Sequence, residues 1–102
     1  MQAQVRLKQD ETVRTYGIRA TAVPYREEIE RVIDDADSVV IDFRNKDATQ
    51  SFIDELIGAL VLRRGRGVLS KLVFENCTAQ VKAIIRFVVQ DRLAQVAQRA
   101  VA

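Results

Sequence analysis

The stretch of residues 39–62, VVIDFRNKDATQSFIDELIGALVL, constrains the fold more than any other part of the chain. A short apolar run ends in Asp42 and Phe43, a polar turn follows, and an amphipathic segment opens on Thr49 and Ser51. Such a strand–turn–helix unit is typical of parallel α/β sheets, in which a helix joins one strand to the next. The unit also places hydroxyl groups where the start of a helix meets solvent.

The periodicity of the remaining residues predicts the element order ββαβαβα within one domain, residues 1–102. Alternation predicts strands at Gln4–Lys8 and Thr15–Ala20, joined by a turn at Gln9–Thr12 into an antiparallel hairpin. Pro24 then suits the first position of a helix. The apolar stripe of that helix consists of Tyr25, Ile29, Val32, Ile33 and Ala36.

Two further apolar runs, in Ser38–Phe43 and Lys71–Asn76, predict central strands that are covered on both faces. Helices are predicted at Ser51–Arg63 and Thr78–Gln98. The first carries two adjacent apolar rows, namely Phe52, Leu56 and Leu60, and Ile53, Ile57 and Val61. The inward-facing apolar stripe of the second consists of Val81, Ile84, Ile85, Val88, Leu93 and Val96. Gly58 weakens the first of these helices, which predicts a close approach of that helix to the sheet. We therefore expect an α/β fold with a four-stranded mixed sheet and three helices.

Composition limits the function as well as the fold. The 102 residues are 48% hydrophobic and 29% charged, as in globular proteins, and their apolar runs are too short to span a bilayer. The single cysteine, Cys77, excludes an internal disulfide, fits a reducing compartment and is expected to be half-buried. The first residues show no secretion signal. We therefore expect a cytoplasmic protein without a membrane partner.

The chain contains no histidine. This removes the commonest general acid/base and, with one cysteine, leaves no structural zinc site and no Ser–His or Cys–His pair. The carboxylates show no spacing that would bring several of them together. Asp42 is expected to order the turn after its strand, and Asp47 to be solvated. We expect no catalytic residues, no metal site and no cofactor, and hence no enzyme.

Charge is distributed unevenly along the chain. Residues 1–51 carry eight Lys/Arg and ten Asp/Glu, whereas residues 52–102 carry eight and four. The dense basic segment Arg63–Arg66 would allow contact with nucleic acid, but a solvated loop after a helix is favoured because few aromatic residues accompany it. Nucleic acid is therefore an unlikely partner. Lys82 and Arg86 share a helix face that is expected to be solvated.

Three segments, together with the order of elements, resemble the STAS-like domain family of unknown function. The segments are VIDF at 40–43, SFIDEL at 51–56 and FEN at 74–76. The family comprises small bacterial relatives of the STAS fold, which is named after sulfate transporters and anti-sigma factor antagonists. The resemblance covers about residues 14–95 and implies a STAS-like fold with a regulatory role.

The resemblance also implies a mechanism. In anti-sigma factor antagonists, a partner with a histidine-kinase-type ATPase fold phosphorylates a serine at the helix start after the Asp-Phe strand, and this releases the partner. Ser51 occupies the matching position and is the phosphorylation candidate. The antagonists carry an acidic residue before that serine and Ser-Gly after it, where this chain has Gln50, Phe52 and Ile53.

From the residues alone, two roles remain open for the same hydroxyls. Ser51 or Thr49 also suits the N-cap of the helix, and Asp54 would complete a capping box with Ser51. A cap and a modification site are compatible, because a capping hydroxyl already lies at the mouth of the helix.

The expected function is therefore a non-enzymatic regulatory module that docks a protein partner, by resemblance an ATPase or kinase. The docking surface is predicted at the turn and the helix start, at Arg44, Asn45, Lys46, Asp47, Thr49, Gln50, Ser51, Asp54 and Glu55. The alternative is a small-molecule or nucleotide site at the carboxyl ends of the central strands, where Arg44–Thr49 and Asn76–Thr78 would meet. An exposed edge strand would also allow a homodimer.

Overall fold

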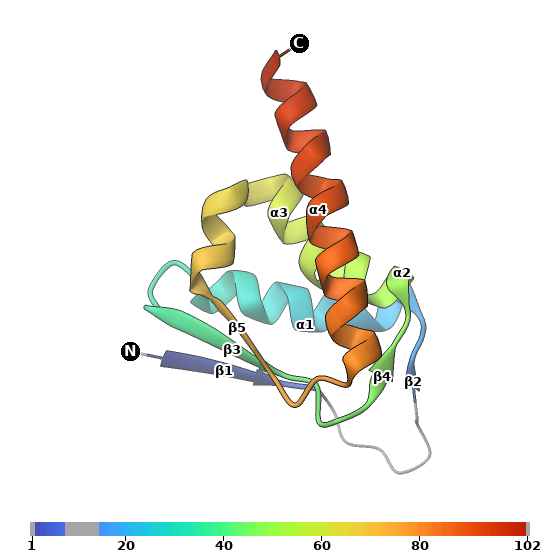
Figure 1. Cartoon of the computed structure of the whole chain (residues 1–102). Helices are drawn as coiled ribbons and strands as arrows, with labels where there is room; N and C mark the ends of the chain where they lie inside the picture. Colours follow the sequence, from blue (N-terminus) through green and yellow to red (C-terminus); the bar gives the residue numbers. More distant parts are fainter. Residues whose placement is uncertain (1, 8–14, 102) are drawn as a thin grey trace.

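The structure, a computed structural model, describes residues 2–7 and 15–101 (Figure 1). Its main sheet has three parallel strands in the order β1-β3-β5, namely β1 (Gln2–Arg6), β3 (Ser38–Asp42) and β5 (Leu72–Glu75). In the register of these strands, Ile41 lies between Val5 and Phe74. A second, smaller sheet pairs β2 (Thr15–Tyr16) with β4 (Asp47–Ala48), also in parallel.

The predicted hairpin and the predicted four-stranded mixed sheet are therefore wrong. β1 and β2 belong to different sheets, and the second predicted strand shrinks to Thr15–Tyr16. Alternation identifies a strand and its buried face but not its partner. Pairing with β3 buries Val5 and leaves Gln4 and Arg6 exposed, so it satisfies the alternation without a hairpin. The predicted turn at Gln9–Thr12 lies outside the described residues.

The first helix, α1, spans Arg19–Val32 and thus begins five residues before Pro24. Pro24 lies inside the helix and has no N–H to donate to the carbonyl four residues earlier. Two contacts hold the extra turn in place: Ala22 is fully buried, and Arg19 forms an ion pair with Asp54 at 3.0 Å. The predicted apolar stripe is confirmed, since its members are buried or packed against the core.

The second predicted helix is continuous from residue 50 to 64 but contains a π-helical stretch. It consists of α2 (Gln50–Ile53), η1 (Asp54–Gly58) and α3 (Ala59–Arg64). The two predicted apolar rows are both fully buried: Phe52, Leu56 and Leu60, and Ile53, Ile57 and Val61. Each such side chain contributes about 1.5–3 kcal/mol to folding. This helix is therefore the centre of the core.

The chain continues through the 3₁₀ helix η2 (Arg66–Lys71) into β5, and then into α4 (Ala79–Val101). The hydroxyl of Thr78 accepts a hydrogen bond from the N–H of Val81 at 3.1 Å, which is the bond of an N-cap. α4 packs on the core through its first half, where Val81, Ile85 and Val88 are buried. Its C-terminal half extends past the other elements (Figure 1).

The helices lie on one side of the main sheet (Figure 1). Val39, Ile41 and Phe43 of the central segment face them and belong to the core cluster. The prediction of a central strand that is buried on both faces is confirmed for β3, whose residues 39–42 are all buried. It is wrong for β5, which pairs with one described strand only and leaves Val73 and Glu75 exposed. Val40 and Asp42 face the other side and are nevertheless only 4% and 6% exposed.

Gly58 is the position where the predicted close approach occurs, but its neighbour is not the sheet. A Cβ at Gly58 would lie 2.6 Å from Oδ1 of Asp54, 3.1 Å from Cγ1 of Val88 and 3.2 Å from Cγ of Arg92. The glycine thus allows the π-helical segment to approach α4.

Candidate functional site

Asp42 organises the carboxyl end of the central strand. Its Oδ1 accepts hydrogen bonds from the backbone N–H of Arg44 and from Nδ2 of Asn76, both at 2.9 Å. Arg6 of β1 lies 3.9 Å from its other oxygen. The hydrogen bond from Asn76, with those N–H and guanidinium groups, holds the pKa of Asp42 below its usual value although burial acts in the opposite direction. The prediction that Asp42 orders the turn is confirmed.

The turn itself has an uncommon backbone. Arg44 and Asn45 adopt positive φ angles of 59° and 61°, and the N–H of Lys46 donates to the carbonyl of Phe43 at 3.1 Å. Two consecutive residues with positive φ are the mark of a type I′ turn, which glycine and asparagine favour. The N–H of Asn45 also donates to the carbonyl of Asn76, itself at φ 53°. The two loops predicted to meet at the strand ends do meet.

Asp47 and Thr49 connect this turn to the helix. Oγ1 of Thr78 donates to Oδ1 of Asp47 at 2.8 Å, so Asp47 is half-buried and bonded rather than solvated. Oγ1 of Thr49 accepts the N–H of Phe52 at 3.2 Å and donates to the carbonyl of Gly17 at 3.0 Å. Thr49 is therefore the N-cap, and it also ties the segment after β2 to the helix.

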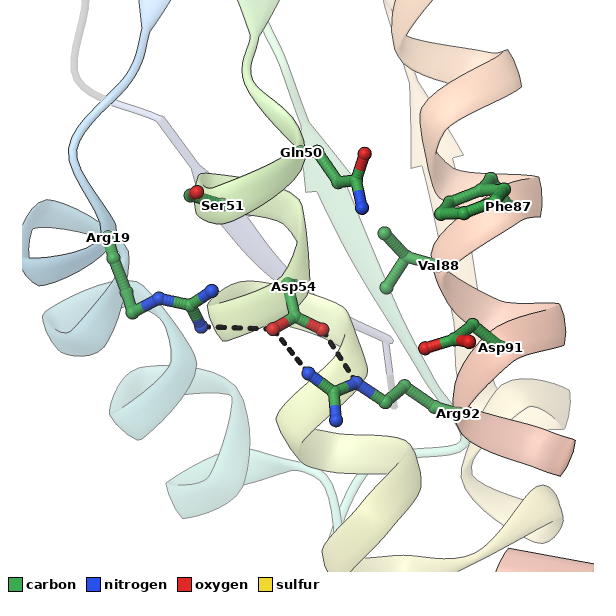
Figure 2. A pocket seen from close by; sticks show the side chains of 8 residues that line it. All are labelled: Arg19, Gln50, Ser51, Asp54, Phe87, Val88, Asp91 and Arg92. Atoms are coloured by element: carbon green, nitrogen blue, oxygen red, sulfur yellow. Dashed lines mark hydrogen bonds and ion pairs between the residues drawn. The ribbon is translucent and has the colours of Figure 1, made fainter. Parts of the chain in front are cut away.

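Ser51 consequently lies one residue inside the helix and is exposed. It borders an open cleft of about 270 Å³ between the start of this helix, the start of α1 and the middle of α4. Figure 2 shows the cleft, and we call it the Ser51 cleft. Its lining residues are Arg19, Gln50, Ser51, Asp54, Phe87, Val88, Asp91 and Arg92.

The floor of the Ser51 cleft is an ion-pair cluster around Asp54 (Figure 2). Arg92 of α4 donates two hydrogen bonds to the carboxylate, from Nε at 2.7 Å and from Nη2 at 2.5 Å. Arg19 of α1 donates a third, at 3.0 Å. Burial raises the pKa of Asp54, but the hydrogen bonds from both arginines outweigh it and leave the pKa below its usual value. The same contacts raise the pKa of Arg92.

This geometry excludes the capping box between Ser51 and Asp54, because the carboxylate of Asp54 is taken up by arginines of two other helices. It also divides the predicted docking residues. Gln50, Ser51 and Asp54 line the cleft. The turn and strand that precede Thr49 and the helix contain Arg44, Asn45, Lys46 and Asp47. Glu55 instead pairs with Arg26 of α1 at 3.2 Å.

Five cleft residues were not predicted as site residues from the sequence: Arg19, Phe87, Val88, Asp91 and Arg92. Phe87 lies outside the apolar stripe of its helix, and an aromatic residue at such a position was the sequence signal that could have identified it. In the structure, Phe87 is 56% exposed. The positions of Arg19 and Arg92 depend on how three helices meet, which no local pattern records.

The basic segment after the helix is largely engaged within the protein. Arg63 pairs with Glu30 at 3.0 Å, and Arg64 pairs with Asp34 at 2.7 Å. Within residues 2–7 and 15–101, no three His, Cys, Asp or Glu side chains gather in a way that could hold a metal ion. In that same part of the chain, none of the helices combines the length and apolarity needed to cross a membrane.

The fold and the site define a small parallel α/β domain in which a hydroxyl-bearing helix start follows the central strand. The family model described as STAS-like domain of unknown function (DUF4325) matches residues 22–82, more than half of the 102 residues. The chain therefore belongs to this family. No curated protein and no solved structure matches the chain. The matched region includes Asp42 and Ser51 and ends before Phe87 and Arg92.

Proposed function

We propose that this protein is a non-enzymatic regulatory module that docks a protein partner at the Ser51 cleft. One observation carries the proposal: an exposed serine in the first turn of a helix shares an open cleft with an exposed aromatic side chain. Membership of a STAS-like family supports a regulatory role. By the resemblance to anti-sigma factor antagonists, the partner is an ATPase of the histidine-kinase type.

Phe87 provides the apolar anchor that a docking surface needs. More than half of its side chain is exposed, although it projects from a helix whose neighbouring Val88 is fully packed. The binding energy of an interface is usually concentrated in a few residues, each worth about 2 kcal/mol or more, roughly a thirtyfold change in affinity, and aromatic side chains are enriched at interfaces. Replacing Phe87 should change the stability of the free protein little, because the residue is exposed and the core remains intact without it.

Ser51 provides the point of control. In the proposed transfer by the partner, the hydroxyl oxygen of Ser51 bonds to the γ-phosphorus of ATP, the bond from that phosphorus to the β,γ-bridging oxygen breaks, and ADP and the hydroxyl proton are released. The phosphoserine adds about 1.5 to 2 negative charges at the mouth of the cleft. Arg19 is a cation that can respond to this charge, since it lines the same cleft and its side chain is 51% exposed. The phosphoserine competes with Asp54 for this guanidinium, so modification changes the charge and the shape of the docking surface without unfolding the domain.

Affinity capture from an extract of the native cells tests this proposal. Tagged wild-type protein is expected to retain an ATPase, and Phe87→Ala and Ser51→Asp are expected to retain much less of it. Val73→Ala is the matched control. Val73 is likewise an exposed apolar residue, at 40%, but it lies in β5 on the main sheet. Equal retention by all four proteins would remove the Ser51 cleft as the docking surface.

A further inference from the structure

A second hollow lies on another side of α4. It has a volume of about 320 Å³ and is lined by residues of α4 and of the η2–β5 segment. Figure 1 shows the course of α4 and β5. Its walls are mainly apolar and comprise Leu69, Phe74, Cys77, Ile85 and Val89. We call it the β5 groove. Lys82 and Arg86 form its polar rim.

The β5 groove runs beside an open edge of the sheet. β5 pairs with β3 on one side, and none of the other described strands pairs with its second side. Phe74 and Leu72 point toward the helices, so Phe74 contributes to the wall of the groove. Val73 and Glu75 alternate to the opposite face, and the one acidic residue of β5 therefore points away from the groove.

The two cations on the rim are available to a partner. Lys82 and Arg86 are both exposed and lie one turn apart on α4. In the described part of the chain, neither of them forms an ion pair with a carboxylate, whereas Arg26, Arg64 and Arg92 each hold one at 3.2 Å or less. Two positive charges therefore lie beside an apolar hollow, where a carboxylate of a partner could form an ion pair with them.

We propose that the β5 groove binds an extended acidic segment of another protein. The segment adds to the free edge of β5 through backbone hydrogen bonds, places an aliphatic side chain against Phe74 and Ile85, and directs Asp or Glu side chains to Lys82 and Arg86. Strand addition supplies affinity, and the acidic flank supplies selectivity.

A second copy of this chain fits less well than an acidic segment. Two copies joined edge to edge at β5 by a two-fold axis would bring α4 of each copy toward the other. Lys82 and Arg86 of both copies would then face like charges across the join. The site is also separate from the Ser51 cleft, because at 3.6 residues per turn Phe87 and Asp91 lie roughly opposite Lys82 and Arg86 on α4.

Synthetic peptides of defined pattern test the proposal with the whole chain. The probe peptides alternate Val or Ile with polar residues and carry Asp and Glu at both ends; the comparison peptides carry Lys instead. Wild-type protein is expected to bind the acidic peptides more tightly than the basic ones by about tenfold, with an affinity that falls as salt is raised. Equal binding of both sets would overturn the proposal.

Paired charge reversals locate the binding. Lys82→Glu with Arg86→Glu is expected to lower the affinity for acidic peptides about tenfold. Arg31→Glu with Arg99→Glu is the matched control, with the same change of net charge at exposed positions away from the groove, and is expected to leave affinity unchanged. Equal losses in both variants would indicate an effect of net charge alone and would contradict the proposal.

The single cysteine gives an independent readout. Cys77 is half-buried in the groove, and burial raises the pKa of its thiol, so alkylation by iodoacetamide is slow and is best followed at alkaline pH. Bound peptide is expected to slow it further. An unchanged rate at saturating peptide would place the peptide elsewhere. Phe87→Ala is expected to bind the peptide normally, so failure at this groove and failure at the Ser51 cleft are distinguishable. Sedimentation of the free protein as a dimer through β5 would also overturn the proposal.

Discussion

At the residue scale, one carboxylate connects three segments that lie far apart in the sequence. Asp42 of β3 accepts hydrogen bonds from the turn that follows it and from Asn76 after β5, and it faces Arg6 of β1. The left-handed conformations of Arg44, Asn45 and Asn76 are each unfavourable by about 1 kcal/mol or more, and these hydrogen bonds help to hold them in place. The helix that carries Ser51 starts from this fixed turn.

Replacing Asp42 with alanine should therefore lower the free energy of unfolding by about 2–3 kcal/mol, because two partly buried hydrogen bonds lose their charged acceptor. Asp42→Asn keeps an acceptor oxygen and should cost less. Urea denaturation followed by circular dichroism gives both values. Asp35→Ala, at an exposed position, is the control. A midpoint for Asp42→Ala equal to that of the control would refute the assigned role.

Stability should also depend on pH in a defined direction. The pKa values of Asp42 and Asp54 are lower in the folded protein than in an unfolded chain, so the unfolded chain binds more protons in acid. Their contribution is complete above about pH 5 and is lost as the pH falls below about 4, through the folded pKa values. Urea midpoints measured across this range should fall in acid, and Asp42→Asn with Asp54→Asn should flatten the curve. An equally steep curve for the double variant would contradict the assignment.

Local sequence patterns predicted the role of a hydrogen-bonded or charged residue well only when its partners are near it in the sequence. The position of Asp42 at a strand end and the capping residues of the next helix follow from a few neighbouring residues. Thr49 and Ser51 could not be separated as caps, because the choice depends on the bond from Thr49 to Gly17, 32 residues away. The contacts of Arg19 and Arg92 with Asp54 depend in the same way on helix packing.

At the scale of elements, the apolar rows of the helix at 50–64 were predicted and its π-helical stretch was not. Both rows stay buried through η1, where the N–H of Ala59 donates to the carbonyl of Asp54 five residues earlier. Apolar spacing tolerates one wider turn, so it does not reveal one. The partners of the strands were predicted wrongly for a comparable reason. Thr15–Tyr16 pairs with β4, which lies far away in the sequence and follows the turn at residues 43–46.

Gly58→Ala tests the packing of η1 against α4. Alanine is favoured over glycine in a helix by about 1 kcal/mol, so helix propensity alone predicts stabilisation. The added Cβ would lie within 3.2 Å of Asp54, Val88 and Arg92, and Asp54 is held in place by its arginines. We therefore expect a net loss of about 1–3 kcal/mol in thermal or urea unfolding.

Gly67→Ala is the matched control for this substitution. Nothing lies within 4 Å of a Cβ at Gly67, so the change should be neutral or slightly stabilising. A gain in stability for Gly58→Ala similar to that of the control would show that the approach of η1 to α4 is looser than described.

At the scale of the whole molecule, α4 separates two surfaces of different chemistry. One side carries Phe87 and the Ser51 cleft, with its central charges paired within the protein. Another side carries the apolar β5 groove, whose rim has two cations, Lys82 and Arg86, that pair with no carboxylate in the described part of the chain. The main sheet turns its second face, lined by Gln4, Arg6 and Glu75, toward solvent. The sequence predicted the fold class, the central strand and the helix start, and the meeting of distant helices created both surfaces.

The central claim is that Ser51 controls docking at its cleft, and the affinity of the captured ATPase for the two forms of the protein tests it most directly. Calorimetric titration should compare unmodified protein with protein phosphorylated at Ser51, as verified by intact mass. We predict that phosphorylation weakens binding about tenfold or more, because it adds negative charge beside Phe87 and competes with Asp54 for the guanidinium of Arg19. Equal affinity of the two forms would contradict the account.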